Sequence, residues 1–127
     1  MEQSVLPLKD ELRAHPVPDA WKGTLCSIVR AFLRKDFCLS APITGVDPVA
    51  DEVASQIEEF ISDYGVSLIE LPHETWNSSC AQWMGDRWNV LVDLWSEEEG
   101  RSDLVLECVV TESNEDFRFK VHLVYVP

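Results

Sequence analysis

Positive charge is what this sequence most clearly lacks. The 127 residues contain 10 Lys and Arg against 23 Asp and Glu, which gives a formal net charge of −13 at pH 7. Between Asp36 and Asp86 there is no Lys or Arg at all. A surface of this sign repels nucleic acid and anionic membranes. We therefore expect neither of them as a partner.

Long apolar runs are missing too. No stretch approaches the roughly 18 apolar residues of a membrane-spanning helix, and Met1–Asp10 lacks the basic start and apolar core of a secretory signal. We expect a soluble, cytoplasmic protein. Hydrophobic residues make up 46% of the chain, which is enough apolar surface to fold, and the length predicts a single domain over residues 1–127.

Motifs for metal, phosphate or disulfide chemistry are also absent. No two of the five glycines are close enough to form a phosphate-binding loop, and the three histidines are isolated, which argues against a His/Cys metal site. We expect no cofactor and no metal. The cysteines are widely spaced, and we expect them to be reduced and buried: Cys26, Cys38, Cys80 and Cys108.

Two segments show the apolar spacing of amphipathic helices. The first begins near Pro18. The second is predicted to begin at Asp47-Pro48, an N-cap followed by a first-turn proline, and to end at Gly65. Residues 1–16 have no firm period and indicate a short helical turn or a loosely docked arm. The buried stripe of the second helix should comprise Val49, Val53, Ile57, Phe60, Ile61 and Tyr64.

The rest of the chain favours strands. Val66–Leu71 predicts an edge strand closed by Pro72, and His73–Asp86 predicts irregular structure with a helical turn. Three later runs, each rich in Val, Leu and aromatic residues, predict an antiparallel meander: Trp88–Trp95, Leu104–Val110 and Phe117–Val126. Alternation along the last run should place five side chains in the core: Phe117, Phe119, Val121, Leu123 and Tyr125.

These elements predict an α+β fold. Two N-terminal helices should pack on one face of a mostly antiparallel sheet of about four strands, which ends in the three-stranded meander. The middle and first strands of the meander carry apolar residues on both faces. The second face should therefore be partly covered or serve as an interaction surface.

The cation-free stretch from Asp36 to Asp86 is the strongest functional signal. Its ten carboxylates should destabilise the fold by mutual repulsion, so we expect a function for them, namely attraction of a basic protein. Trp76 is a candidate aromatic anchor at the contact, although packing in the core is the simpler role for the tryptophans. The expected partner-binding residues are Asp51, Glu52, Glu58, Glu59, Asp63, Glu70, Glu74 and Trp76.

Two other functions stay open. A small hydrolase or nuclease-like enzyme would use Asp93, Glu107 or His122, or Cys80 with His73 or His122 as its base. Such a nuclease would normally add a basic surface, which this chain lacks. The third alternative is a homo-oligomeric structural protein that pairs through the second sheet face; we otherwise expect a monomer or a homodimer.

The segment Trp83–Trp95 and the closing Val121–Pro127 resemble a small family of uncharacterised bacterial domain proteins. The likeness covers most of the chain and implies no activity and no catalytic residue. In size, acidity and helix-then-sheet order, the chain is also similar to immunity proteins of bacterial toxin systems, which bind a toxin and block it. That similarity implies a non-enzymatic inhibitor whose partner is a basic protein such as a nuclease toxin.

Overall fold

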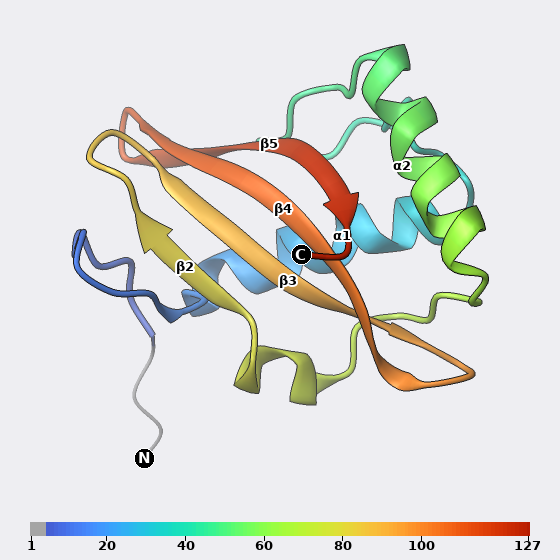
Figure 1. The fold of residues 1–127 in the computed structure, drawn as a ribbon. Coiled ribbons are helices and arrows are strands. Elements are labelled where there is room, and N and C mark those ends of the chain that lie inside the picture. Colours follow the sequence, from blue (N-terminus) through green and yellow to red (C-terminus); the bar gives the residue numbers. More distant parts are fainter. Residues whose placement is uncertain (1–4) are drawn as a thin grey trace.

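The structure is a computed structural model, and it describes residues 5–127. Its elements follow one another along the chain as a short strand, two helices, a 3-10 turn and four strands (Figure 1). Their bounds are β1 His15–Pro16, α1 Asp19–Leu33, α2 Asp51–Tyr64, η1 His73–Asn77, β2 Cys80–Trp83, β3 Trp88–Ser96, β4 Gly100–Ser113 and β5 Asp116–Tyr125.

All five strands form one antiparallel sheet in the order β1-β2-β3-β4-β5. The order follows the chain because each strand turns back beside the one before it. The α+β class, the N-terminal helices and the C-terminal meander are therefore confirmed. The strand β1 adds a short edge that the sequence pattern did not indicate, since it consists of only two residues.

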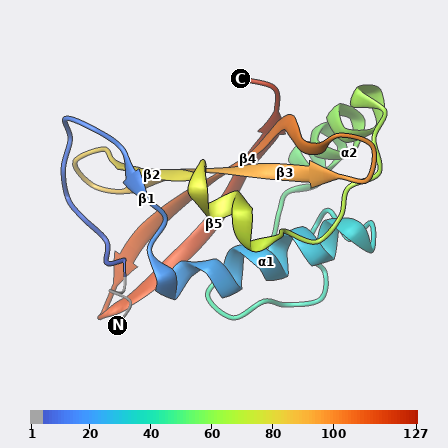
Figure 2. The same cartoon turned by 90° about the horizontal axis from the view of Figure 1, so that it is seen from below.

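The core lies on one side of the sheet. Figure 2 shows α1 crossing that side, whereas α2 lies beside the end of the sheet. Both helices contribute to the same core, because Ile28 of α1 and Ile57 of α2 are fully buried in it. Alternate residues of β3 complete the packing from the sheet: Trp88, Val90, Val92 and Leu94.

The second helix begins later than the Asp47-Pro48 signal predicted. Residue Ala50 is the N-cap of α2, because Asp47 is engaged elsewhere. Its backbone N–H donates to the carbonyl of Phe119 at 2.9 Å, and its Oδ1 accepts from Arg118. The neighbouring Val46 forms a parallel bridge with Phe119. Extended pairing along β5 thus prevents a helical turn at residues 45–48.

The prediction of an edge strand at Val66–Leu71 is wrong. This segment forms only one isolated bridge, between Leu68 and Ser96. The following stretch contains the expected helical turn, η1. Its last part is more regular than expected, since residues 80–83 form β2, which pairs with β3.

The alternation predicted for the last strand holds only as far as Val121. A bulge shifts the register, so that Cys108 faces Val121 but Glu107 faces Leu123. Beyond the bulge Val124 is buried, while Leu123 and Tyr125 are only half-buried, on the other face of the sheet. A single extra residue in one strand reverses the face of every residue after it.

The N-terminal arm is described from residue 5, so residues 1–4 of the predicted 1–16 segment lie outside the described part. It contains β1, which pairs with β2, turns at residues 11–13 and contacts the first residue of α1. The backbone N–H of Asp19 donates to the carbonyl of Val5 at 3.0 Å. The indole N–H of the buried Trp88 donates to the carbonyl of Leu8, also at 3.0 Å.

Candidate functional site

The helix α2 carries five of the predicted partner-binding residues, and all five are exposed: Asp51, Glu52, Glu58, Glu59 and Asp63. The first two stabilise the helix because they lie in its first turn, where the helix dipole favours negative charge. No basic residue occupies its last turn. Gly65 ends the helix with a φ of 83° and donates its N–H to the carbonyl of Ile61.

The five carboxylates form two rows on the helix. Because successive residues are rotated by about 100°, Glu52, Glu59 and Asp63 fall on one side, here called the Glu59 row. The other two, Asp51 and Glu58, fall on a second side, here called the Asp51 row. The two rows flank the exposed surface of α2 and face different neighbours.

None of these five carboxylates forms an ion pair with any side chain in the described range 5–127. Other carboxylates of the cation-free stretch are neutralised by arginines from outside it: Asp47 pairs with Arg118, Glu70 with Arg30 and Asp86 with Arg87. The unpaired negative charge of the stretch is therefore concentrated on α2.

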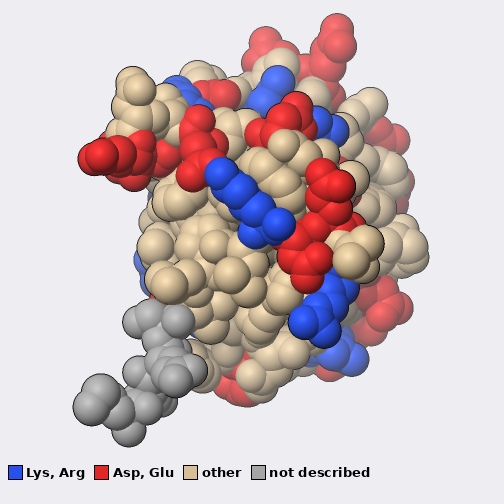
Figure 3. All heavy atoms as spheres, turned by 90° about the vertical axis from the view of Figure 1, so that its left-hand side faces the viewer, with Lys and Arg blue, Asp and Glu red and all other residues tan. Residues whose placement is uncertain are grey.

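The opposite side of the molecule has a mixed charge. Figure 3 shows the side that faces left in Figure 1, away from α2, where Lys and Arg side chains lie among Asp and Glu. This side of the protein therefore carries cations among its carboxylates, whereas the carboxylates of α2 form no ion pair with a described side chain.

The structure separates the remaining predicted contact residues from α2. Glu74 and Trp76 belong to η1, which lies away from α2 in both Figures 1 and 2. Trp76 is half-buried, and the ammonium group of Lys22 lies 5.6 Å from the centre of its ring, a cation–π contact. These residues and the paired Glu70 do not join the α2 carboxylates in one continuous site.

An apolar hollow lies beside the Glu59 row, between α2 and the end of β5. We call it the α2–β5 hollow. Its volume is about 460 Å³. Phe60, which was predicted to be buried, is 45% exposed, and Val126 is 50% exposed. The hollow is lined by Phe60, Asp63, Tyr64, Leu104, Leu123, Tyr125 and Val126.

The two tyrosine hydroxyls of the hollow form hydrogen bonds with residues outside its lining. The hydroxyl of Tyr125 donates to Glu107 at 2.8 Å, and that of Tyr64 accepts from the backbone N–H of Asp103 at 3.1 Å. The rings of both tyrosines therefore present their apolar parts to the hollow. The carboxylate of Asp63 belongs to its lining, and Glu59 lines an adjoining hollow with Phe60.

Sequence reasoning assigned four of the lining residues to the core: Phe60, Tyr64, Leu123 and Tyr125. No sequence signal predicted the bulge that turns Leu123 and Tyr125 to the other face of the sheet. Phe60 did carry a signal: about 100° per residue places it at the margin of the stripe centred on Ala54 and Ile57. A margin position is buried only if a neighbouring element extends over it, and α2 projects beyond the β5 edge (Figure 1).

The carboxylates of the enzymatic alternative are on one sheet face, and each interacts with partners of its own. Asp93 faces Val105, whereas Glu107 faces Leu91, one row further along. The carboxylate of Asp93 accepts from the hydroxyl of Ser78. Glu107 accepts from Tyr125, and its second oxygen lies 3.5 Å from Nε2 of His122. The structure thus brings Glu107 and His122 together, without Asp93.

The thiols have environments that disfavour the thiolate. Burial raises the pKa of Cys80, and the charge of Asp93 raises it further. Burial also raises the pKa of Cys26, and complete burial raises that of Cys108 to about 12. Because the thiolate is the nucleophile, these environments do not activate a cysteine. No group of His, Cys, Asp and Glu within residues 5–127 is suited to hold a metal ion.

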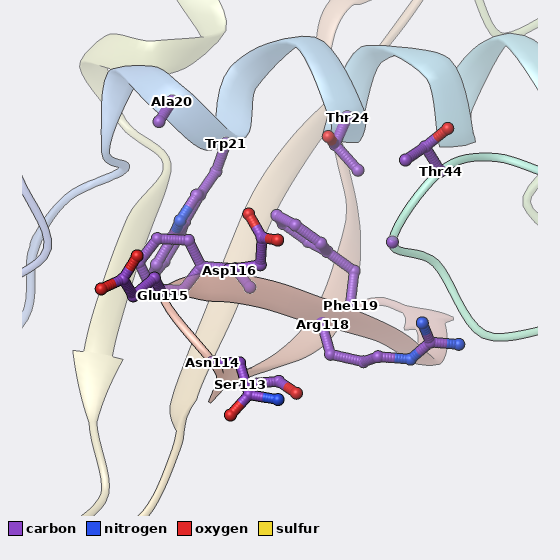
Figure 4. A pocket seen from close by; sticks show the side chains of 12 residues that line it. Ala20, Trp21, Thr24, Thr44, Ser113, Asn114, Glu115, Asp116, Arg118 and Phe119 are labelled. Carbon is purple, nitrogen blue, oxygen red and sulfur yellow. The ribbon is translucent and has the colours of Figure 1, made fainter.

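A larger cavity lies elsewhere, between α1 and the β4–β5 hairpin, with a volume of about 700 Å³. Figure 4 shows its lining, with Trp21 on α1, Thr44 on the following loop and Asp116 on the hairpin. Trp21 is 1% exposed, and its indole N–H has no acceptor among the described residues. The rings of Trp88, Phe117 and Phe119 surround it in edge-to-face geometry, which offers only weak N–H···π contacts.

Among residues 5–127, no helix is both long and apolar enough to cross a membrane. No curated protein and no solved structure matches the chain. One family matches residues 29–127, from the second half of α1 through β5, and its description is "Domain of unknown function (DUF7668)". The chain belongs to this family of domains of unknown function.

Proposed function

We propose that this chain is a non-enzymatic binding module that holds a basic protein partner against α2. The observation that carries the proposal is the set of five exposed carboxylates on one helix, none of which forms an ion pair with a described side chain. Arginines neutralise neighbouring carboxylates of the same stretch but leave these five free. A cationic surface would supply the missing counter-charges.

The repulsion between carboxylates of α2 in the free protein supports a role in binding. Glu59 and Asp63 are four residues apart on the helix, a spacing at which like charges repel by a few tenths of a kcal/mol. The repulsion would be relieved by a basic partner. The net charge of −13 also creates a long-range field, and such fields accelerate the association of oppositely charged proteins.

The more specific form of the proposal is an inhibitor of immunity type. A nuclease toxin must present basic residues to the phosphate backbone of its substrate. An acidic helix that binds those residues would occupy the surface on which the substrate lies, and so would block the enzyme without any chemistry of its own. Acidity, size and helix-then-sheet order support this form.

Affinity capture from extracts of the source cells, at low and high salt, tests the proposal. Wild-type protein is compared with E58K/E59K on α2 and with E115K/D116K on the exposed β4–β5 hairpin, which changes the net charge equally. Basic proteins should be captured by wild type and the hairpin variant at low salt. The α2 variant should capture at least about tenfold less, a loss of about 1.4 kcal/mol.

Equal capture by all three proteins would show that α2 is not the contact surface. Equal loss in both variants would show that only the net charge matters. Circular dichroism melts of the three proteins provide the control for folding. Enrichment of acidic rather than basic proteins would also overturn the proposal.

A further inference from the structure

We propose that the α2–β5 hollow receives one large apolar side chain of the basic partner, while Glu59 and Asp63 pair with cationic residues on either side of it. The inference rests on the proposed function and makes it more specific. It commits to a partner segment in which one Leu-sized or aromatic side chain is flanked by Lys or Arg. It also distinguishes which side of α2 makes the contact.

Exposure of Phe60 is the first argument. The other large apolar residues of α2 are covered to a greater degree, and Ile57 is fully buried. Opposite Phe60, the half-exposed Val126 forms the other wall, and the buried Leu104 contributes to the base. A hollow with apolar walls beside charged groups has the anatomy of a binding hot spot, in which one buried anchor is surrounded by a polar rim.

Shape and rigidity favour a single anchor. A volume of about 460 Å³ is at the small end of the range for small-molecule pockets, and this hollow is shallow and open on one side. The ring of Tyr125 is held by its hydrogen bond to Glu107, and the ring of Tyr64 by its bond to the backbone of Asp103. The walls are therefore ordered before a partner arrives, which lowers the entropic cost of binding.

Charge complementarity selects the chemistry of the occupant. Glu59 and Asp63 lie on the same side of α2 as the hollow. No described basic side chain lines the hollow or its neighbour beside Glu59. An apolar side chain entering here from an acidic segment would bring like charges together, whereas a basic segment would pair them. The rim therefore favours a cationic partner.

The Asp51 row offers a poorer site. Its two carboxylates line a separate hollow together with Lys35 and Asp36, so that hollow already includes a cation of the chain itself. The Sγ of Cys38 is 3.4 Å from Oδ1 of Asp51, which engages one carboxylate. Adjacent residues on α2 therefore have different roles: Glu59 belongs to the contact, and Glu58 contributes only to the long-range field.

This difference provides a matched pair of variants. E58K and E59K make the same change of charge at neighbouring exposed positions of one helix. The probe is a synthetic lysine-rich peptide with one central leucine, and its control is the same peptide with serine at that position. Binding is followed by ¹H–¹⁵N NMR titration of the whole protein, with attention to the amides of Phe60, Asp63, Leu123 and Tyr125.

Wild type should bind the leucine peptide about tenfold more tightly than the serine peptide, the gain expected from burying most of one leucine side chain. The shifts should cluster at the four named amides. F60S and V126S should abolish the preference for leucine, because each removes an apolar wall of the hollow. Val126 is half exposed and lies outside the strands, so the V126S variant keeps the test valid if F60S lowers stability. E59K should weaken binding several-fold more than E58K.

Equal affinity for the two peptides, or equal effects of E58K and E59K, would overturn the hollow as the anchor site while leaving the electrostatic proposal intact. Shifts that cluster at residues 35–41 would do the same and would assign the contact to the Asp51 row. If neither peptide binds in a salt-dependent manner, the proposed function itself fails and the inference fails with it.

Discussion

Tyr125 donates its phenolic hydroxyl to Oε1 of Glu107 at 2.8 Å, across the boundary between β5 and β4. The bond exists because the bulge in β5 turns Tyr125 to the same face as Glu107. It fixes the ring that forms one wall of the α2–β5 hollow. One contact thus shapes the proposed anchor site and engages one acid of the enzymatic alternative.

The first prediction concerns the titration of Tyr125. The hydrogen bond to Glu107 is the main reason why the pKa of Tyr125 is raised above its ordinary value of 10.0, because ionisation would place a phenolate beside a carboxylate. In E107Q the charge is gone, so the pKa should fall toward the ordinary value. Absorbance titration in a Y64F background isolates this tyrosine. An unchanged titration curve would mean that the bond does not form in solution.

Cys108 should be inert to alkylation in the folded protein. Complete burial raises its pKa to about 12, so almost no thiolate exists near neutral pH, and reagent has no access. Iodoacetamide labelling followed by mass spectrometry should modify Cys108 only when denaturant unfolds the chain, whereas the partly exposed Cys38 should react slowly in the native protein. Labelling of Cys108 at the same rate with and without denaturant would contradict its placement in the core.

Glycine at position 35, just after the end of α1, should make the protein more stable. Lys35 has a φ of 64°, which costs a residue with a side chain about 1–2 kcal/mol. Its backbone N–H donates to the carbonyl of Phe32, and that of Asp36 donates to Ala31, so the conformation closes the helix. K35G should increase the free energy of unfolding by about 1 kcal/mol.

Removal of the charge is the confounding effect in K35G. K35A also removes the charge but keeps the strained backbone, so it is the matched control in denaturant titrations. Equal stability of K35G and K35A would show that φ at this position is not positive in solution.

The stability that the loop between the helices gives to the fold should depend on pH, because it involves the carboxylate of Asp36. Its carboxylate accepts bonds from the backbone N–H groups of Ser40 and Ala41 at 2.8 and 3.1 Å, and these bonds lower its pKa below the ordinary value of 3.8. The folded state therefore holds this proton less tightly than the unfolded state. The resulting stabilisation is present above pH 3.8 and is lost as the pH falls through the lower, folded value.

D36N should accordingly be less stable than wild type at neutral pH, and the difference should narrow below pH 3.8, where wild type loses the same charge. Thermal melts across that range give the measurement. E115Q, on the exposed hairpin, controls for the general effect of removing one negative charge. A difference between D36N and wild type that stays constant with pH would argue against the capping bonds.

Several features of the fold were predictable because they depend on local patterns. The helical spacing around Trp21 and Ile28 indicated α1, and the run Trp88–Trp95, rich in Val, Leu and aromatic residues, indicated β3. Gly65 was recognisable as the end of α2, since a left-handed terminal residue favours glycine. Each of these signals is contained within a few neighbouring residues.

The errors occurred where distant residues compete for the same backbone groups. Asp47 and Pro48 form a good local start for a helix, but pairing of this segment with Phe119 takes the backbone of Asp47 into the sheet. Val66–Leu71 has the composition of a strand, yet it forms a bridge only at Leu68. Local propensity does not determine which distant segment will form hydrogen bonds with these backbone groups.

The sequence by itself determined the charge of this protein, its class of fold and the concentration of carboxylates on one amphipathic helix, because composition and periodicity are properties of the chain. Only the tertiary structure decided which carboxylates are neutralised, since Arg30 and Arg118 come from other elements to pair with Glu70 and Asp47. It also decided that Phe60 and Tyr125 line an open hollow. Their exposure depends on the position of a bulge and on the place where the sheet ends. The spacing of residues within a single element determines neither of these positions.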